Sequence, residues 1–259
     1  MATTEKAMRE SIIAHGASLI AAGLSGPIGG DISARFDDSL LITPSGVSYP
    51  RLRPPMIALM PLIGEYGAWK GPLKPAGEWR IHLDIARARP DIGAIIRFQS
   101  PYATALAMAG KPIPAAHPMI ALFGTPIIRC AKYAPAGARE LASVTLEALG
   151  QGHAVLLSNS CALTTGATLA AALVRARELE TLARLYAIAL ALGRPAILAD
   201  EEVARIGERL KANGADVEAR VAALVETRAK AKRKAKVKAK VKVKAPAKAK
   251  RVARKRRRS

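Results

Sequence analysis

The sequence predicts an α/β layered domain followed by a basic tail. Segments with the apolar content of strands are interleaved with segments of helical period, as in a sheet covered by helices. Half of the 259 residues are apolar and 24% are charged, a composition typical of a globular domain. The formal net charge of +21 is concentrated at one end, which indicates two unlike parts in one chain.

The expected elements follow from local patterns. A helix is expected over residues 4–22, because its apolar residues recur at helical spacing and Gly23 follows it. A hairpin is expected next, with strands at 32–36 and 40–43 and a turn between them. The other expected helices are 78–88, 102–109, 138–149, 168–192 and 201–224, and the other expected strands are 93–98, 127–131 and 154–157.

The helix expected over 168–192 has the strongest pattern. Leucine and alanine recur at helical spacing from Leu169 to Leu182. Glu180 stands four residues before Arg184, the spacing of an ion pair on a helix surface. This stripe indicates core or subunit contact.

Charge divides the chain into a predicted domain at 1–227 and a predicted tail at 228–259. The first part holds 23 Lys/Arg and all 20 Asp/Glu, whereas the tail holds 18 Lys/Arg and no acid. A segment of that composition is expected to be disordered and to bind nucleic acid or another polyanion without sequence preference. The cations expected to contact nucleic acid are Lys232, Arg233, Lys234, Lys236, Lys238, Lys240, Arg254, Lys255, Arg256, Arg257 and Arg258.

Several protein classes are excluded by composition. Two cysteines, Cys130 and Cys161, cannot form a disulfide scaffold and suit a reducing compartment. No apolar stretch reaches the roughly 20 residues that cross a bilayer. The start of the chain lacks the apolar core of a signal peptide. We therefore expect a soluble cytoplasmic protein without a membrane span.

An ordered set of motifs resembles the class II aldolase/adducin family. The motifs are Gly23-Leu24, Gly30-Asp31-Ile32-Ser33-Ala34-Arg35, Leu41-Ile42-Thr43-Pro44-Ser45-Gly46-Val47, Lys74-Pro75, Glu78-Trp79, His82, Ala88-Arg89-Pro90-Asp91, Ile113-Pro114-Ala115, Cys130-Ala131-Lys132-Tyr133 and Leu179-Glu180. The resemblance implies a three-layer domain with a central mixed or antiparallel sheet. It also implies a homo-oligomer, usually a tetramer, with sites at the subunit boundaries.

The same resemblance implies functional residues. Glu78 matches the catalytic glutamate that moves the proton, and Tyr133 matches the assisting tyrosine of a neighbouring subunit. Ser45 and Gly46 match part of the phosphate loop, so both are expected to bind substrate. Asp31 stands where the family has a phosphate-binding asparagine, which brings negative charge towards that group.

The metal ligands of the family are absent from the sequence. The resemblance places two zinc-binding histidines of one strand at Arg97 and Gln99, and the third at Ser160. Arginine only donates hydrogen bonds, and amide or hydroxyl oxygens are poor ligands for zinc. We therefore expect no metal and no cofactor, with zinc expected only if the aldolase activity survives.

Arg97 and Glu78 remain to be explained. We hypothesise that the Arg97 guanidinium replaces the cation and pairs with Glu78, either as a purely structural pair or as an electrophile for a small anion.

The sequence leaves three functions open. The first is a degenerate family member without zinc or turnover, acting as a scaffold or small-anion binder with a nucleic-acid-binding tail. The alternative is an active aldehyde-lyase, or a related sugar-phosphate enzyme, with a site rebuilt around Glu78, Tyr133 and Arg97. The third places all function in the tail as a nucleic-acid compactor.

Overall fold

The computed structural model describes residues 3–26 and 29–213 and divides the chain into two units, residues 1–207 and 208–259. Residues 200–207, at the end of the first unit, and the described residues of the second unit, 208–213, are helical. The predicted tail at 228–259 lies outside the described residues, as does the second half of the helix expected over 201–224. The domain boundary at 227 and the tail's contacts with nucleic acid therefore stay predictions.

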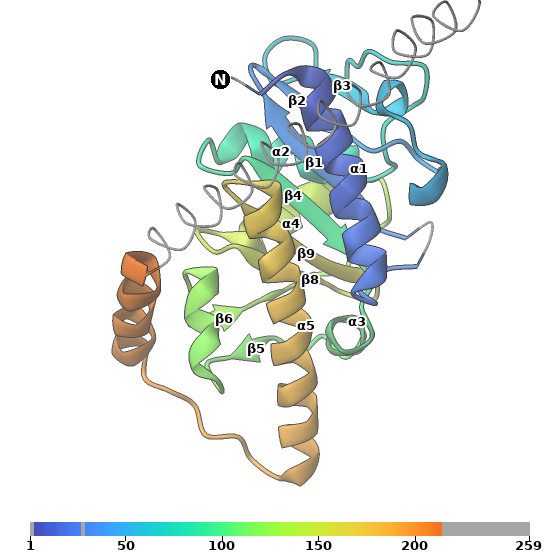
Figure 1. Cartoon of the computed structure of the whole chain (residues 1–259). Helices are drawn as coiled ribbons and strands as arrows, with labels where there is room; N and C mark the ends of the chain where they lie inside the picture. The colour runs from blue at the N-terminus through green and yellow to red at the C-terminus, as the bar shows by residue number, and fades with distance from the viewer. Residues whose placement is uncertain (1–2, 27–28, 214–259) are drawn as a thin grey trace, which may run out of the picture. The chain divides into compact units, whose positions relative to one another are not determined.

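The first unit alternates helices and strands in the order that Figure 1 labels. Its helices are α1 (Glu5–Ala21), α2 (Trp79–Ala88), α3 (Pro101–Met108), α4 (Arg139–Leu149) and α5 (Leu169–Leu192), with shorter 3-10 helices η1 (Tyr49–Arg51), η2 (Pro54–Met56) and η3 (Pro118–Phe123). Its strands are β1 (Asp31–Phe36), β2 (Ser39–Ile42), β3 (Ala58–Pro61), β4 (Ala94–Phe98), β5 (Ile113–Pro114), β6 (Ile127–Ile128), β7 (Cys130–Ala131), β8 (Ala154–Leu157) and β9 (Cys161–Gly166).

Seven strands form one sheet in the order β3-β2-β1-β4-β9-β8-β7. Every neighbouring pair is antiparallel except β7 and β8, which run parallel. Strands β5 and β6 form a separate two-stranded sheet. This mostly antiparallel central sheet confirms the predicted fold class.

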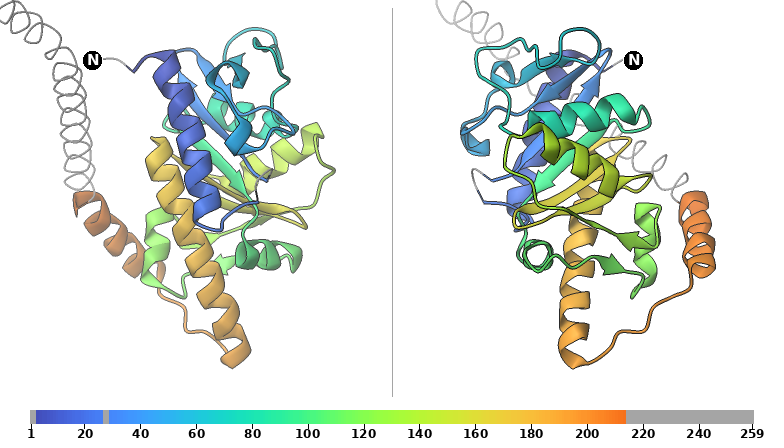
Figure 2. Two further views of the ribbon diagram at one scale, coloured as in Figure 1. Left: turned by 45° about the vertical axis from the view of Figure 1, so that its right-hand side comes forward. Right: turned by 180° about the vertical axis from the view of Figure 1, so that it is seen from behind.

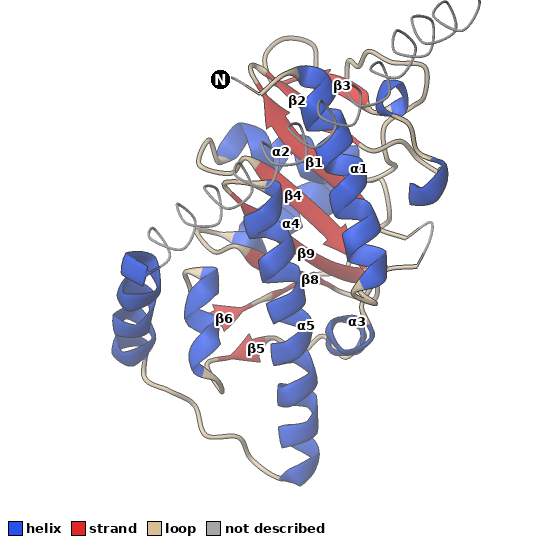
Figure 3. Ribbon diagram, viewed as in Figure 1, coloured by secondary structure: helices blue, strands red, loops and turns tan. Residues whose placement is uncertain are grey.

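Helices cover both faces of the large sheet, as the secondary-structure colouring of Figure 3 shows. Helices α1 and α5 lie over one face, with α3 beside α5, and the reverse view in Figure 2 shows α2 and α4 over the other. The core under α2 and α4 joins Ile85, Leu141, Val155 and Leu163, all less than one-tenth exposed. Burial of these aliphatic side chains stabilises the packing of α2 and α4 on the sheet.

Three strands were not predicted from the sequence: β3, β9 and the two-residue strand β5. Every residue of β9 is buried, because helices cover both of its faces, so it has no polar and apolar alternation to recognise. Strand β3 ends at Pro61 and lies at the edge of the sheet, where a proline is tolerated. The strand expected over 127–131 is instead two short strands, β6 and β7, in different sheets.

Glu180 differs from its expected role. Its carboxylate accepts hydrogen bonds from the Ser100 hydroxyl and from the backbone N–H groups of Tyr102 and Ala103, at 2.6, 2.9 and 2.9 Å. These N–H groups begin α3 and have no partners within that helix. Glu180 therefore joins α5 to the start of α3 and makes no ion pair with Arg184.

None of the described helices has the length and apolar content that a membrane crossing requires.

Candidate active site

A polar pocket of about 190 Å³ opens where β1 begins and β4 ends. These strands are antiparallel neighbours, so the first residue of β1 lies beside the end of β4. The loop after β2 and the segment before α2 complete the wall. The lining residues are Gly29, Gly30, Asp31, Thr43, Pro44, Ser45, Gly46, Val47, Tyr49, Ala76, Gly77, Arg97 and Gln99. The pocket thus brings together the predicted substrate-binding residues and Arg97.

Asp31 and Arg97 form a bidentate ion pair in the wall of this pocket. Arg97 Nε donates to Asp31 Oδ1 at 2.9 Å, and Arg97 Nη2 donates to Asp31 Oδ2 at 2.6 Å. Burial favours the neutral acid, but the guanidinium and His82 outweigh it and hold the pKa of the Asp31 carboxyl well below its usual range. Burial likewise disfavours the Arg97 cation, but Asp31 raises its pKa further above the ordinary value. Both groups are therefore charged at neutral pH.

A buried histidine holds the Asp31 carboxylate from the other side. His82 Nε2 lies 2.8 Å from Asp31 Oδ1, and because an ionised carboxylate only accepts hydrogen bonds, the nitrogen is the donor. The other ring nitrogen, Nδ1, lies 2.8 Å from the Ser33 hydroxyl. His82 and Ser33 are fully buried and Asp31 nearly so. His82 is thus a packed histidine, and Ser33, His82, Asp31 and Arg97 form one hydrogen-bonded chain.

The expected ion pair between Glu78 and Arg97 is wrong. Arg97 pairs with Asp31, its register partner across β1 and β4, which adjacent strands bring together without any help from a loop. Glu78 precedes α2, and its carboxylate accepts a hydrogen bond from the Gly137 backbone N–H at 3.1 Å. Glu78 does not line the polar pocket.

The residues at the family's metal positions do not fit a divalent cation. Arg97 places a fixed positive charge at one of them, and Gln99 offers only a neutral amide. Ser160 donates to the Cys161 thiol at 3.4 Å, and Arg97 Nη1 lies 3.6 Å from the same sulfur. Burial raises the pKa of that thiol, against the smaller opposing effect of Arg97. Within residues 3–26 and 29–213, no group of three His, Cys, Asp or Glu side chains could hold a metal ion.

The other predicted site residues lie in different places. Ser45 and Gly46 line the pocket, and Gly46 has a φ of 71°, which favours glycine. Tyr133 lies on the loop after β7, is 67% exposed and does not line the pocket of its own chain.

Sequence reasoning missed Tyr49. Its ring is buried, and its hydroxyl makes no hydrogen bond of ordinary geometry among the described residues, although the Thr43 side chain is near enough to affect its pKa. Tyr49 begins η1 and lines the pocket with Asp31 and Arg97. The available signal was an aromatic residue just after Ser45-Gly46. A short polar loop has no hydrophobic core of its own, so an aromatic ring in it indicates packing against another element.

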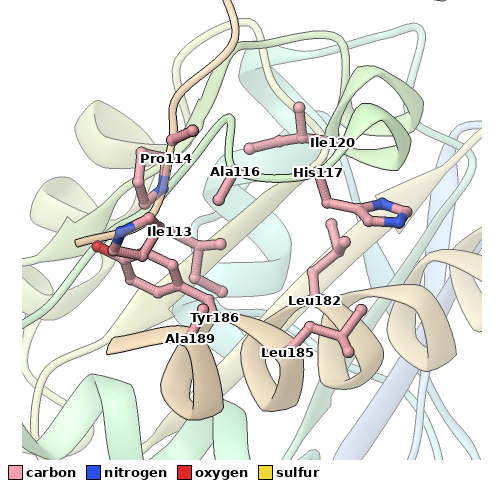
Figure 4. A pocket seen from close by; sticks show the side chains of 11 residues that line it. Ile113, Pro114, Ala116, His117, Ile120, Leu182, Leu185, Tyr186 and Ala189 are labelled. Atoms are coloured by element: carbon pink, nitrogen blue, oxygen red, sulfur yellow. The ribbon is translucent and has the colours of Figure 1, made fainter. Parts of the chain in front are cut away.

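A second pocket, of about 370 Å³, contains none of the predicted site residues. Figure 4 shows Leu182, Leu185, Tyr186 and Ala189 of α5 on one side of it, with Ile113, Pro114 and Ile120 opposite. Its walls are mostly apolar, and the His117 ring nitrogen Nδ1 already accepts from the Met119 backbone N–H. The polar pocket is therefore the candidate active site.

Comparisons with known proteins agree with this fold. Residues 10–187 match the model of the class II aldolase and adducin N-terminal domain. A Rhodospirillum rubrum protein named 5-methylthioribulose-1-phosphate/5-deoxyribulose-1-phosphate aldolase is 40% identical over 80% of this chain and 93% of its own. An Escherichia coli L-fuculose phosphate aldolase is 37% identical over 76% of this chain and 90% of its own. A solved L-fuculose 1-phosphate aldolase superposes with a TM-score of 0.75 and 34% identity, covering 78% of this chain and 95% of the other.

These relatives overturn the expectation of a degenerate scaffold or small-anion binder. Proteins that share 33–40% identity with most of this chain are named as aldolases, and nothing in the comparisons indicates loss of activity. The alternative of an active aldehyde-lyase is better supported. With a family match over more than half of its length and relatives covered almost end to end, this chain belongs to the class II aldolase/adducin family.

Proposed function

We propose that this chain is a carbon–carbon lyase that cleaves a ketose 1-phosphate. The observation that carries the proposal is the 40% identity to the Rhodospirillum rubrum aldolase over nearly all of that protein. The polar pocket supports it, since its wall holds a fixed cation, Arg97, beside the Ser45-Gly46 turn. The substrates to test are those in the relatives' names: 5-methylthioribulose 1-phosphate, 5-deoxyribulose 1-phosphate and L-fuculose 1-phosphate.

The reaction requires a positive group at one oxygen. Cleavage between C3 and C4 takes the proton from the C4 hydroxyl and sends the C3–C4 electron pair towards the C2 carbonyl. The C4 fragment leaves as an aldehyde, and the C2 oxygen of the other fragment becomes negative. Protonation at C3 then gives dihydroxyacetone phosphate. A cation already fixed in a low-dielectric pocket stabilises that oxygen without reorganising during the reaction.

Arg97 is the group that we assign to this oxygen. Asp31 occupies Nε and Nη2, while the nearest described partner of Nη1 is the weakly accepting Cys161 sulfur. One hydrogen on Nη1 and the second hydrogen on Nη2 therefore remain to bind a substrate oxygen. Because Asp31 neutralises the pair, this end of the pocket suits a carbonyl better than a phosphate dianion, so we place the phosphate at Ser45 and Gly46.

Glu78 and Tyr133, which do not line the polar pocket of their own chain, are assigned by the resemblance alone. The hydrogen bond from Gly137 to Glu78 ties the start of α2 to the loop that carries Tyr133. We propose that Glu78 moves the proton and that Tyr133 of a neighbouring subunit assists. This requires a homo-oligomer, for which we propose a tetramer, and the exposure of Tyr133 suits a role towards another subunit. We place the enzyme in the cytoplasm, which agrees with the free thiols of Cys130 and Cys161.

The test is a cleavage assay with the purified full chain and the three ketose phosphates named above. Dihydroxyacetone phosphate is followed by a coupled reduction, and the aldehyde is identified by mass spectrometry. We expect cleavage of at least one substrate well above the rate without protein. The proposal is contradicted if none of the three substrates releases dihydroxyacetone phosphate.

A further inference from the structure

We propose that the Tyr49 hydroxyl is a second hydrogen-bond donor, beside Arg97, to the substrate oxygen that becomes negative. The inference rests on the proposed lyase function and adds a catalytic residue to it. Tyr49 is about 5% exposed and lines the polar pocket, and its hydroxyl makes no hydrogen bond of ordinary geometry among the described residues. The Thr43 side chain, which also lines the pocket, lies near enough to lower the pKa of that hydroxyl slightly, against the larger effect of burial. An unpaired buried hydroxyl destabilises a fold, so its presence in a substrate pocket points to a ligand that pairs with it.

The ring cannot turn away to find another partner. Gly16 of α1 faces it so closely that a Cβ at that position would lie 2.0 Å from two ring carbons. Tyr49 is itself the first residue of the 3-10 helix η1, which restrains its backbone. A group held by close packing keeps its direction when the substrate changes charge, which is the requirement for preorganised stabilisation.

The charges around Tyr49 make it a donor rather than an anion. Burial, and then the Asp31 carboxylate, raise the pKa of the Tyr49 hydroxyl well above its ordinary value. The Asp31 oxygens already accept from Arg97 and His82. A phenol that stays protonated beside a satisfied carboxylate offers its hydrogen to an incoming oxygen. Tyr49 keeps this proton through the reaction, so no atom is transferred to or from it.

The positions of Tyr49 and Arg97 suggest a ligand oxygen between them. Both line the same pocket of about 190 Å³, one from the loop after β2 and the other from β4. A neutral donor and a cation in the wall of one pocket favour a carbonyl oxygen that acquires negative charge. This recognition would distinguish a ketose phosphate from the corresponding alcohol.

The experiment compares the wild-type chain with Tyr49→Phe and with Tyr66→Phe as a matched control. The Tyr66→Phe substitution also removes only a hydroxyl. That hydroxyl donates to Asp84 at 2.8 Å and lies outside the pocket. For Tyr49→Phe we expect kcat to fall about 100-fold, the effect of removing one oxyanion donor. KM should rise less, by about tenfold, because the same hydroxyl also binds the neutral carbonyl. Tyr66→Phe should leave both constants within about twofold.

Thermal unfolding separates this role from a structural one. Removing an unsatisfied hydroxyl should leave the melting temperature of Tyr49→Phe equal to or above that of the wild type. A lower melting temperature, or a kcat within about twofold of wild type, would overturn the inference.

Calorimetric titration with dihydroxyacetone phosphate tests Tyr49 even if no substrate is cleaved. Binding to the wild type that weakens tenfold or more in Tyr49→Phe supports Tyr49 although the lyase proposal fails. Equal binding by the two proteins, or no binding by the wild type, overturns the inference.

Discussion

Asp31 and Arg97 are register partners across β1 and β4, and their side chains close into a bidentate pair with 2.6 Å between Oδ2 and Nη2. The pair supplies its own charge balance inside the pocket, and His82 fixes the carboxylate from behind. The positive charge at the pocket wall is the Arg97 guanidinium itself, and three hydrogen bonds from it to Asp31 fix its position. Its orientation is the property on which the proposed chemistry depends.

The first prediction concerns the loss of the acid. Asp31→Asn leaves Arg97 mostly buried without a counterion, so we expect the free energy of unfolding to fall by about 3 kcal/mol. Urea unfolding measures the change. In a double-mutant cycle, the Asp31→Asn/Arg97→Met double variant should lose less free energy of unfolding than the sum of the two single losses. The reason is that both charges are then removed together.

Asp91→Asn is the control for that cycle. Asp91 also pairs with an arginine, Arg89, at 2.7 Å, but its side chain is 53% exposed. We expect less than about 1 kcal/mol of destabilisation there. Additive effects at Asp31 and Arg97 would show that the pair is not energetically coupled.

The second prediction separates the charge of Arg97 from its geometry. Lysine keeps the charge but cannot make the planar bidentate contact or direct a second nitrogen at the substrate. We expect Arg97→Lys to lower kcat about 100-fold while the protein stays folded. Steady-state kinetics with the best ketose phosphate measure this effect. Arg80→Lys is the control, since the Arg80 guanidinium lies 4.5 Å from the Trp79 ring centroid and outside the pocket. Wild-type kcat in Arg97→Lys would contradict the role of the guanidinium.

The third prediction concerns the packing behind Tyr49. In an unobstructed helix, Gly→Ala stabilises by up to about 1 kcal/mol. At Gly16 the new methyl would lie 2.0 Å from the Tyr49 ring, so we expect destabilisation of about 1–3 kcal/mol and a lower kcat. Denaturant unfolding and kinetics measure the two effects. Gly26→Ala, where nothing lies within 4 Å of the added carbon, should change kcat little. Stabilisation by Gly16→Ala with unchanged kcat would show that the ring is free to move.

The fourth prediction is that the free energy of unfolding depends on pH through His153. Burial, followed by Arg175 and Arg89, lowers the pKa of His153 to about 4. In the unfolded chain the imidazole has its ordinary pKa of about 6.5, so between these values the unfolded state binds more protons. Stability from the neutral ring is therefore complete above about pH 6.5 and is lost as pH falls towards 4.

His153→Gln tests this dependence, because glutamine keeps a polar side chain near Thr165 and does not titrate. We expect the variant to lose less stability than the wild type between pH 6.5 and 4, as measured by urea midpoints at several pH values. Parallel pH curves for the two proteins would exclude His153 as the source.

Local pattern predicted most of the helices and the chain's division by charge. The stripe from Leu169 to Leu182 predicted α5, because one face of that helix is buried against the sheet. Strand β9 escaped prediction because burial on both faces removes the alternation that marks a strand. Glu180 was misassigned for a related reason: spacing along one helix says nothing about the backbone N–H groups of another helix that lies beside it.

The sequence by itself determined the family, the α/β class and the absence of histidines at Arg97, Gln99 and Ser160, since each is a property of residue types in order. Only the tertiary structure decided which acid meets Arg97. Asp31 lies 66 residues away in the chain but directly opposite in the sheet, whereas Glu78 is turned towards Gly137. The orphaned Tyr49 hydroxyl was equally invisible, because whether a polar atom has a partner depends on every element that packs around it.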